Sequence, residues 1–258
     1  MPINIDVALQ YQISDGDMVL LILEAARSDG QSVLESDLEI ENATLRRINP
    51  EGAVGQRIWA NVPGRRFSLR YRAKVDVTRH VVTLENLAAT PLNTLPGKVL
   101  TYLRPSRFCQ SDLFTEFAAQ QFGHLNGGAK IASILDWVTT EMSYVPGSSN
   151  AETTAVETFR AREGVCRDYA HVVCSLARAA RIPARYTSVY GARVNPPDFH
   201  AVAEIWLDGA WHLVDATGMG LATDMVVIGA GRDAADVAFM ETEHWADPIS
   251  QSVAVSQG

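Results

Sequence analysis

Residues 164–171 read GVCRDYAH, and they open an amphipathic pattern that continues through Ala180. Apolar side chains recur there at three- and four-residue steps, as on a helix with one buried stripe; they are Tyr169, Val172, Val173, Leu176, Ala177 and Ala180. The pattern therefore predicts a helix with Cys166 in its first turn. At that position the helix dipole and the unpaired backbone N–H groups favour a thiolate and could hold an oxyanion.

Two downstream segments carry the groups that a cysteine nucleophile requires. His200 lies in DFHA at residues 198–201, and Asp215 lies in WHLVDAT at residues 211–217. A thiol is only a few per cent ionised at neutral pH, so a cysteine enzyme needs a base such as imidazole. A carboxylate on the other ring nitrogen fixes the orientation and tautomer of that base. We therefore predict Cys166 as nucleophile, His200 as base and Asp215 as orienting acid, with a turn cap as the alternative role of Asp215.

The base and the acid are expected on neighbouring strands. Residues 201–207 and 210–215 read as strands, and Asp208-Gly209 between them is a strong hairpin-turn signal. Pairing across this turn sets residues near 202 opposite residues near 215. The hairpin would therefore bring the two side chains within hydrogen-bonding reach.

These motifs together resemble the transglutaminase-like superfamily of papain-type cysteine enzymes. The motifs are GVCxDYAH at residues 164–171, ARIPARY at 180–186, FHA at 199–201 and WxxxDAT at 211–217. More narrowly, they are similar to bacterial transglutaminase-like proteins described as cysteine proteases, as are YLRPSRFC at 102–109 and GRDAADV at 231–237.

The resemblance covers residues 100–240 and implies an α+β papain-like domain in which Cys166, His200 and Asp215 are the catalytic triad. Two residues depart from the family pattern: Val202 stands where many members have Trp, and Ala216 where many have Pro. Neither side chain is needed for proton transfer, so we expect both to affect the shape of the cleft.

Other polar residues near the motifs have structural alternatives. His171 falls five residues after Cys166, on a different helix face, and is expected to be structural. His212 is expected to be a strand residue rather than a second base. Asp168 is expected to order the helix entrance or to pair with Arg185.

A second oxyanion donor is sought upstream of the nucleophile, because relatives use a group there. Tyr144, in MSYVP at residues 142–146, is the candidate, and Trp137 is expected to be a core residue behind it. Substrate specificity is expected from cleft loops such as residues 191–197.

The pattern along the chain changes once and predicts two domains. Residues 1–90 read as a β-rich sandwich or barrel with turns of Gly, Asp, Asn and Pro; the predicted strands are residues 3–13, 18–25, 32–40, 56–62 and 66–77. TPLNTLPG at residues 90–97 is the expected linker. Residues 98–258 then show helical patterns followed by strands, which describes an α+β domain.

Composition limits the classes of function. The 258 residues carry a formal charge of −8 without a long basic cluster, which argues against nucleic acid as partner. The start lacks the basic region of a secretory signal, and no apolar run approaches the ~20 residues that span a bilayer, so a cytoplasmic protein without membrane association is expected. The three cysteines show no zinc-binding spacing. No cofactor or metal is implied, because the nucleophile and base are protein groups.

The resulting expectation is hydrolysis of an amide or peptide bond through a thioacyl-enzyme, with a peptide or protein as substrate. Acyl transfer to an amine, as in a transglutaminase, is the first alternative. A non-catalytic binding domain on the same fold is the second. The oligomeric state is left open by the sequence.

Overall fold

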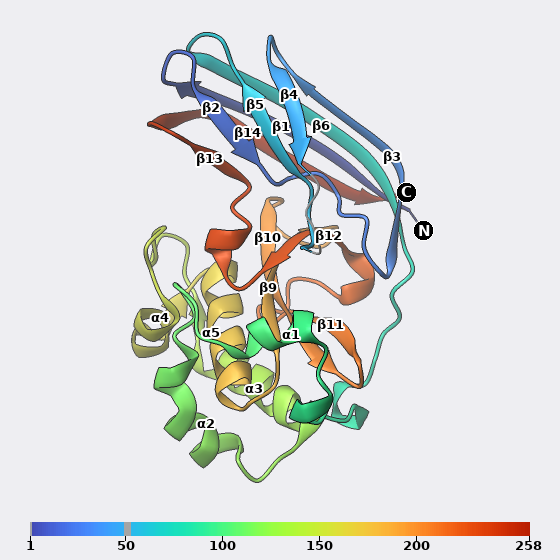
Figure 1. The fold of residues 1–258 in the computed structure, drawn as a ribbon, viewed down its shortest axis with the longest axis vertical. Helices are drawn as coiled ribbons and strands as arrows, with labels where there is room; N and C mark the ends of the chain where they lie inside the picture. Colours follow the sequence, from blue (N-terminus) through green and yellow to red (C-terminus); the bar gives the residue numbers. More distant parts are fainter. Residues whose placement is uncertain (1, 49–52) are drawn as a thin grey trace.

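A computed structural model describes residues 2–48 and 53–258, and it has a β-rich end and a helix-covered end (Figure 1). The β-rich end holds two antiparallel sheets, with strand orders β14-β1-β6-β3 and β13-β2-β5-β4. Their strands are β1 (Pro2–Ile13), β2 (Met18–Leu21), β3 (Gln31–Ile40), β4 (Thr44–Ile48), β5 (Arg57–Asn61), β6 (Arg66–Val77), β13 (Met240–Thr242) and β14 (Ala246–Gln257). Both sheets contribute to one apolar core, so they form a sandwich.

The alternation of side chains explains why these segments form a sandwich. Every second residue of β1, from Ile3 to Ile13, is buried, and β6 repeats this from Phe67 to Val75. Period-two burial places one face of each strand in the core and leaves the other toward solvent. The predicted β-rich N-terminal region is therefore found.

The C-terminal residues return to this sandwich. β13 pairs with β2, and β14 pairs with β1 along nearly its whole length. The prediction of a single domain over residues 98–258 therefore needs correction, because residues 240–257 complete the N-terminal sheets. The sequence of β14 gives little signal of this pairing, because most of its side chains are exposed and its partner is at the other end of the chain.

The other end of the molecule is an antiparallel sheet of order β11-β10-β9-β12 with helices packed against it (Figure 1). Its strands are β9 (Ala184–Gly191), β10 (Phe199–Leu207), β11 (Ala210–Val214) and β12 (Met225–Gly231). The helices are α1 (Gly97–Leu100), α2 (Thr115–Phe122), α3 (Gly127–Glu141), α4 (Ala155–Ala161) and α5 (Cys166–Ala179), with a short parallel pair β7 (Ser143–Tyr144) and β8 (Glu163–Gly164). Helix α5 is central and packs on β9 and β10 through its buried stripe.

The sandwich and the helix-covered part are joined by buried hydrogen bonds. The Gln31 side chain donates to the carbonyls of Ala26 (2.6 Å) and Val227 (2.9 Å), and it accepts from the Val227 N–H (2.8 Å). The Tyr190 hydroxyl donates to the Leu23 carbonyl at 2.7 Å. Strands β12 and β9 are therefore each bonded to the sandwich, and the two parts share a continuous interior.

The fold class predicted from the sequence, a β-rich N-terminal region with an α+β domain, is confirmed by this architecture. Within residues 2–48 and 53–258, no helix has the length and apolar character needed to cross a membrane.

Candidate active site

Cys166 is the first residue of α5, and the helix entrance is shaped by residues of its own motif. The buried Asp168 accepts hydrogen bonds from the Val165 N–H (2.8 Å) and the Ser149 hydroxyl (2.5 Å). A Cβ on Gly164 would lie 2.7 Å from the Cβ of Asp168, so a larger residue does not fit there. Glycine is therefore required for space. The helix geometry leaves the N–H of Cys166 without an intrahelical acceptor.

The predicted base and acid meet across the β10–β11 hairpin. The strands pair Ala203 with Val214 and Leu207 with Ala210, which is the predicted register. His200, at the start of β10, places its Nε2 3.0 Å from Oδ2 of Asp215, just beyond β11. Both side chains are almost fully buried.

Asp215 is held as a carboxylate by several donors. Its Oδ1 accepts from the Thr217 N–H (2.9 Å) and hydroxyl (2.6 Å), and its Oδ2 accepts from the Gly220 N–H (3.1 Å) in addition to His200. Burial by itself raises the pKa of Asp215. The hydrogen bond and charge of His200 and the hydrogen bonds from Thr217 outweigh burial and lower this pKa. The side chain thus both caps its turn and orients the imidazole, which combines the two roles considered from the sequence.

The pKa of His200 links it to Cys166 as well as to Asp215. Burial alone lowers this pKa, but hydrogen bonding to Asp215 and to Cys166 and their charges outweigh burial and raise it to about 9. Because Asp215 contacts Nε2, the nitrogen left for the thiol is Nδ1. A pKa of about 9 keeps the ring protonated at neutral pH, which places a positive charge beside Cys166.

Tyr144 lies close to Cys166 because of the small parallel sheet. Tyr144 of β7 pairs with Gly164 of β8, two residues before Cys166. Burial raises the pKa of the Tyr144 hydroxyl, and the nearby Cys166 thiol raises it further. Trp137 instead stacks on Phe159, with ring centroids 5.2 Å apart, and packs against the core.

Cys166 and His200 open onto a common cleft of about 670 Å³. One wall is β9 and β10, with Tyr186, Ser188 and Phe199. The opposite wall is the segment of residues 234–241 that leads from β12 into β13. Phe199 and Phe239 stack face to face across this cleft, with ring centroids 4.7 Å apart. The specificity loop expected at residues 191–197 does not line it; the wall is formed by residues 234–241 instead.

Three sequence motifs converge beneath the cleft. The buried His171 ring stacks on Phe108 and accepts the Ala234 N–H at Nε2 (3.2 Å). Asp233 accepts the Phe108 N–H at 2.9 Å. Burial lowers the pKa of His171 to about 3, so the ring stays neutral. His171 therefore has a structural role, and it joins the YLRPSRFC and GRDAADV segments to α5.

The remaining candidates lie away from the thiol or bind other partners. Arg185 pairs with Glu204 at 2.6 Å, so the expected alternative pairing of Asp168 with Arg185 is wrong. The His212 ring contacts the carbonyl of Leu207 (3.1 Å) within the hairpin, as expected for a strand residue.

Comparison with known proteins agrees with this architecture. The sequence profile described as the transglutaminase-like superfamily matches residues 116–216. A crystal structure of a candidate cysteine protease from Cytophaga hutchinsonii superposes with a TM-score of 0.93 at 32% identity, covering 99% of this chain and 90% of that one. The chain belongs to the transglutaminase-like superfamily.

Relatives of this superfamily member are also found among mycobacterial proteins. An uncharacterized protein of Mycobacterium tuberculosis is 31% identical over 170 residues, which are 58% of this chain and 53% of the relative. One of Mycobacterium leprae is 28% identical over 111 residues, which are 40% of this chain and 39% of the relative. The chain thus spans about half the length, or less, of the curated relatives it matches. The superfamily and the Cytophaga structure support a general cysteine-enzyme function.

Proposed function

We propose that this transglutaminase-like protein hydrolyses an amide or peptide bond through a thioacyl-enzyme formed on Cys166. The observation that carries the proposal is the buried His200–Asp215 pair, 3.0 Å apart, whose His200 lines the same cleft as Cys166 at the start of α5. A thiol, an imidazole with a raised pKa and an orienting carboxylate are the groups that this chemistry uses.

The reaction balances with these groups alone. The Cys166 thiolate attacks the carbonyl carbon, and its former proton is on His200. The tetrahedral intermediate collapses to a thioester while His200 gives that proton to the departing amine. Water then attacks the thioester, His200 takes its proton, and the acid and the thiolate are released. Asp215 keeps the ring oriented throughout.

The developing oxyanion would be bound by the N–H of Cys166 and by the Tyr144 hydroxyl. The first is an N–H without an intrahelical acceptor at a helix N-terminus, and the second lies near it through the β7–β8 pairing. Loss of one oxyanion donor lowers kcat by about 10²–10³-fold. Tyr144→Phe should therefore lower kcat with little change in KM, and an unchanged kcat would remove Tyr144 from this role.

The proposal is tested by intact-mass detection of the acyl-enzyme after mixing with a peptide library and quenching in acid. We expect an added mass equal to the acyl half of a peptide in the wild type and none in Cys166→Ala. Cys174→Ala is the matched control, because it removes a buried thiol from the same helix and keeps the nucleophile. An adduct that survives Cys166→Ala would place the nucleophile elsewhere.

A primary amine separates hydrolysis from transfer. With excess amine present, a hydrolase still releases the free acid as its main product, whereas a transglutaminase releases the amide of the added amine. The latter product would replace hydrolysis by acyl transfer as the function. Absence of any adduct and any product would favour the non-catalytic binding domain.

A further inference from the structure

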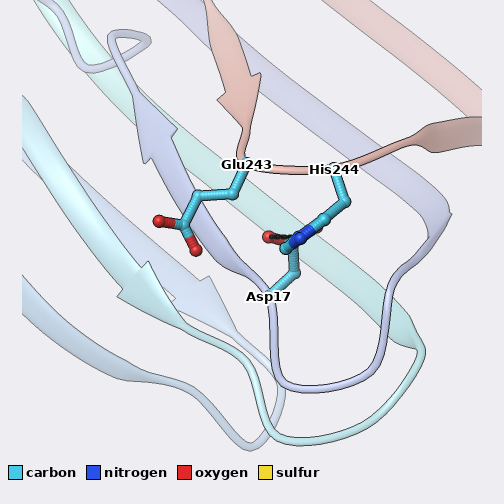
Figure 2. A group of neighbouring side chains, drawn as sticks. All are labelled: Asp17, Glu243 and His244. Carbon is cyan, nitrogen blue, oxygen red and sulfur yellow. Dashed lines mark hydrogen bonds and ion pairs between the residues drawn. The ribbon is translucent and has the colours of Figure 1, made fainter.

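A group of three side chains, distant from the proposed active site, lies where the two sheets of the sandwich are connected. Asp17 is in the turn between β1 and β2, and Glu243 and His244 are in the turn between β13 and β14 (Figure 2). One ligand atom from each of the three lies within 4.8 Å of the others. We propose that this group binds a divalent transition-metal cation of the zinc type.

The backbone around the group is fixed by strand pairing. Thr242 pairs with Val19 in one sheet, and Ala246 pairs with Ile13 in the other. The backbone pairing alone therefore holds the two connecting turns side by side. The Thr242 hydroxyl also donates to the His244 carbonyl at 2.7 Å. The positions of the ligands thus do not depend on a flexible loop finding its conformation.

Asp17 provides the observation that points to a ligand. Only 2% of this residue is exposed, and its Oδ2 has no hydrogen-bond donor among the described residues. The Oδ1 accepts from the Met18 N–H at 3.0 Å, which orients the carboxylate. A buried carboxylate oxygen without a donor is unfavourable, because it has lost its hydrogen bonds to water without forming others in the protein. A cation bound by this carboxylate would remove the deficit.

The distances within the group suit a metal better than an ion pair. His244 Nδ1 lies 3.4 Å from Asp17 Oδ1, which is long for a charge-assisted hydrogen bond. Two ligands at about 2.1 Å from a tetrahedral zinc ion are about 3.4 Å apart, which matches this separation. In Figure 2 the Glu243 carboxylate lies to the left of the Asp17 carboxylate, which the His244 ring overlaps. Two carboxylates this close repel each other unless a cation lies between them.

The ligand types indicate the class of metal. Magnesium and calcium prefer oxygen ligands only, whereas an imidazole nitrogen with carboxylates suits zinc and its neighbours among the divalent transition metals. Glu243 and His244 are exposed, so they can move the small distance needed to close on an ion. The fourth position is left to water.

The site would connect the sandwich to the cleft. Glu243 directly follows β13, and Met240 and Glu241 of β13 line the cleft that holds Cys166. A bound ion would fix the end of this wall to the β1–β2 turn. Residues 240–246 should then exchange their amide hydrogens more slowly when the metal is present.

Calorimetric titration of the tag-free chain with Zn²⁺ tests the site. The background is Cys166→Ala, because a thiol beside an imidazole also binds zinc. We expect one equivalent bound, with affinity reduced at least tenfold by Asp17→Asn and by His244→Ala. Asp15→Asn is the matched control: it removes the same charge from an exposed position in the same turn and should bind as the background protein does.

The two ligand variants keep the test decisive. Asp17→Asn retains the acceptor for the Met18 N–H, and His244→Ala changes a side chain that is 64% exposed, so it should fold even if the first variant does not. Zinc-dependent protection of residues 240–246 that is lost in His244→Ala would support the site. No binding, equal binding by His244→Ala, or binding without that protection would overturn it.

Discussion

At the scale of the residue, the proposed reactivity of Cys166 depends on a proton carried by His200. The pKa of this ring, 6.5 in its ordinary state, is about 9 in the folded protein, because the hydrogen bonds and charges of Asp215 and Cys166 outweigh burial. Because the pKa of His200 is higher in the folded protein, protonation of the ring stabilises the fold. This contribution is complete below pH 6.5 and is lost as the pH rises through 9. The reactive protonated pair should be lost over the same range, so activity is expected to fall as the pH approaches and passes 9.

Asp215→Asn tests the source of this shift. Without the carboxylate, burial dominates and lowers the pKa of His200, so the alkaline limb of the kcat/KM profile should move to lower pH. Disturbed orientation of the base should also lower kcat by about 10²–10⁴-fold. The profile is measured from pH 5 to pH 10 for both proteins. An alkaline limb in the same place would mean that Asp215 does not set the pKa of His200.

The positions of several residues could be predicted from the sequence, and others could not. Cys166, His200 and Asp215 stand in short motifs, and a two-residue turn brings the last two together, so local rules were sufficient to place them. Arg185 was ambiguous because its partner Glu204 is on the neighbouring strand, where one residue of register decides the contact. Asp17 and His244 lie at opposite ends of the chain, and no spacing rule connects them.

At the scale of the element, the start of α5 determines where the thiol lies. Asp168 links the residue before the helix to Ser149, and Gly164 leaves room for that carboxylate. The helix itself was evident from the stripe of apolar residues. The cleft wall of residues 234–241 was not evident from the sequence, because it is a short irregular segment with no periodic pattern. Only its first residues belong to the GRDAADV motif.

Asp168→Ala tests this entrance. The substitution leaves the half-buried Val165 N–H without its acceptor and should lower the free energy of unfolding by about 1–3 kcal/mol. It should also lower kcat, because the Cys166 N–H and thiol lose their fixed position. Ser149→Ala removes only one of the two hydrogen bonds and should have the smaller effect in both measurements. Urea unfolding and steady-state kinetics give the two values; an unchanged stability would show that the helix start does not need Asp168.

At the scale of the whole molecule, the sandwich and the β11-β10-β9-β12 sheet are joined by buried hydrogen bonds, and we expect them to unfold as one cooperative structure. Gln31 satisfies both the N–H and the carbonyl of Val227 on β12, and Tyr190 donates to Leu23 in the sandwich. The sequence suggested separate domains because the β-rich pattern stops before the linker. Long-range pairing of β14 with β1 and of Gln31 with Val227 leaves no local signal.

Gln31→Leu tests this union. The leucine fills similar space but leaves the Val227 N–H without its acceptor, whereas the Val227 carbonyl keeps the Ala26 N–H at 2.8 Å. The free energy of unfolding should therefore fall by about 1–3 kcal/mol. Tryptophan fluorescence, which reports on both parts because Trp59 lies in β5 and Trp206 in β10, and circular dichroism should still report one coincident transition. Two separated transitions in the wild type would show instead that the two parts unfold independently.

Activation of the Cys166 thiol by His200 is tested most directly by the rate at which iodoacetamide alkylates the native protein at pH 6.5, followed by intact mass. Cys109 and Cys174 are fully buried, so a single rapid adduct should form, at Cys166. His200→Ala should slow this adduct by at least tenfold, because the imidazole no longer holds the proton of the thiol. Equal rates in the wild type and in His200→Ala would contradict the account.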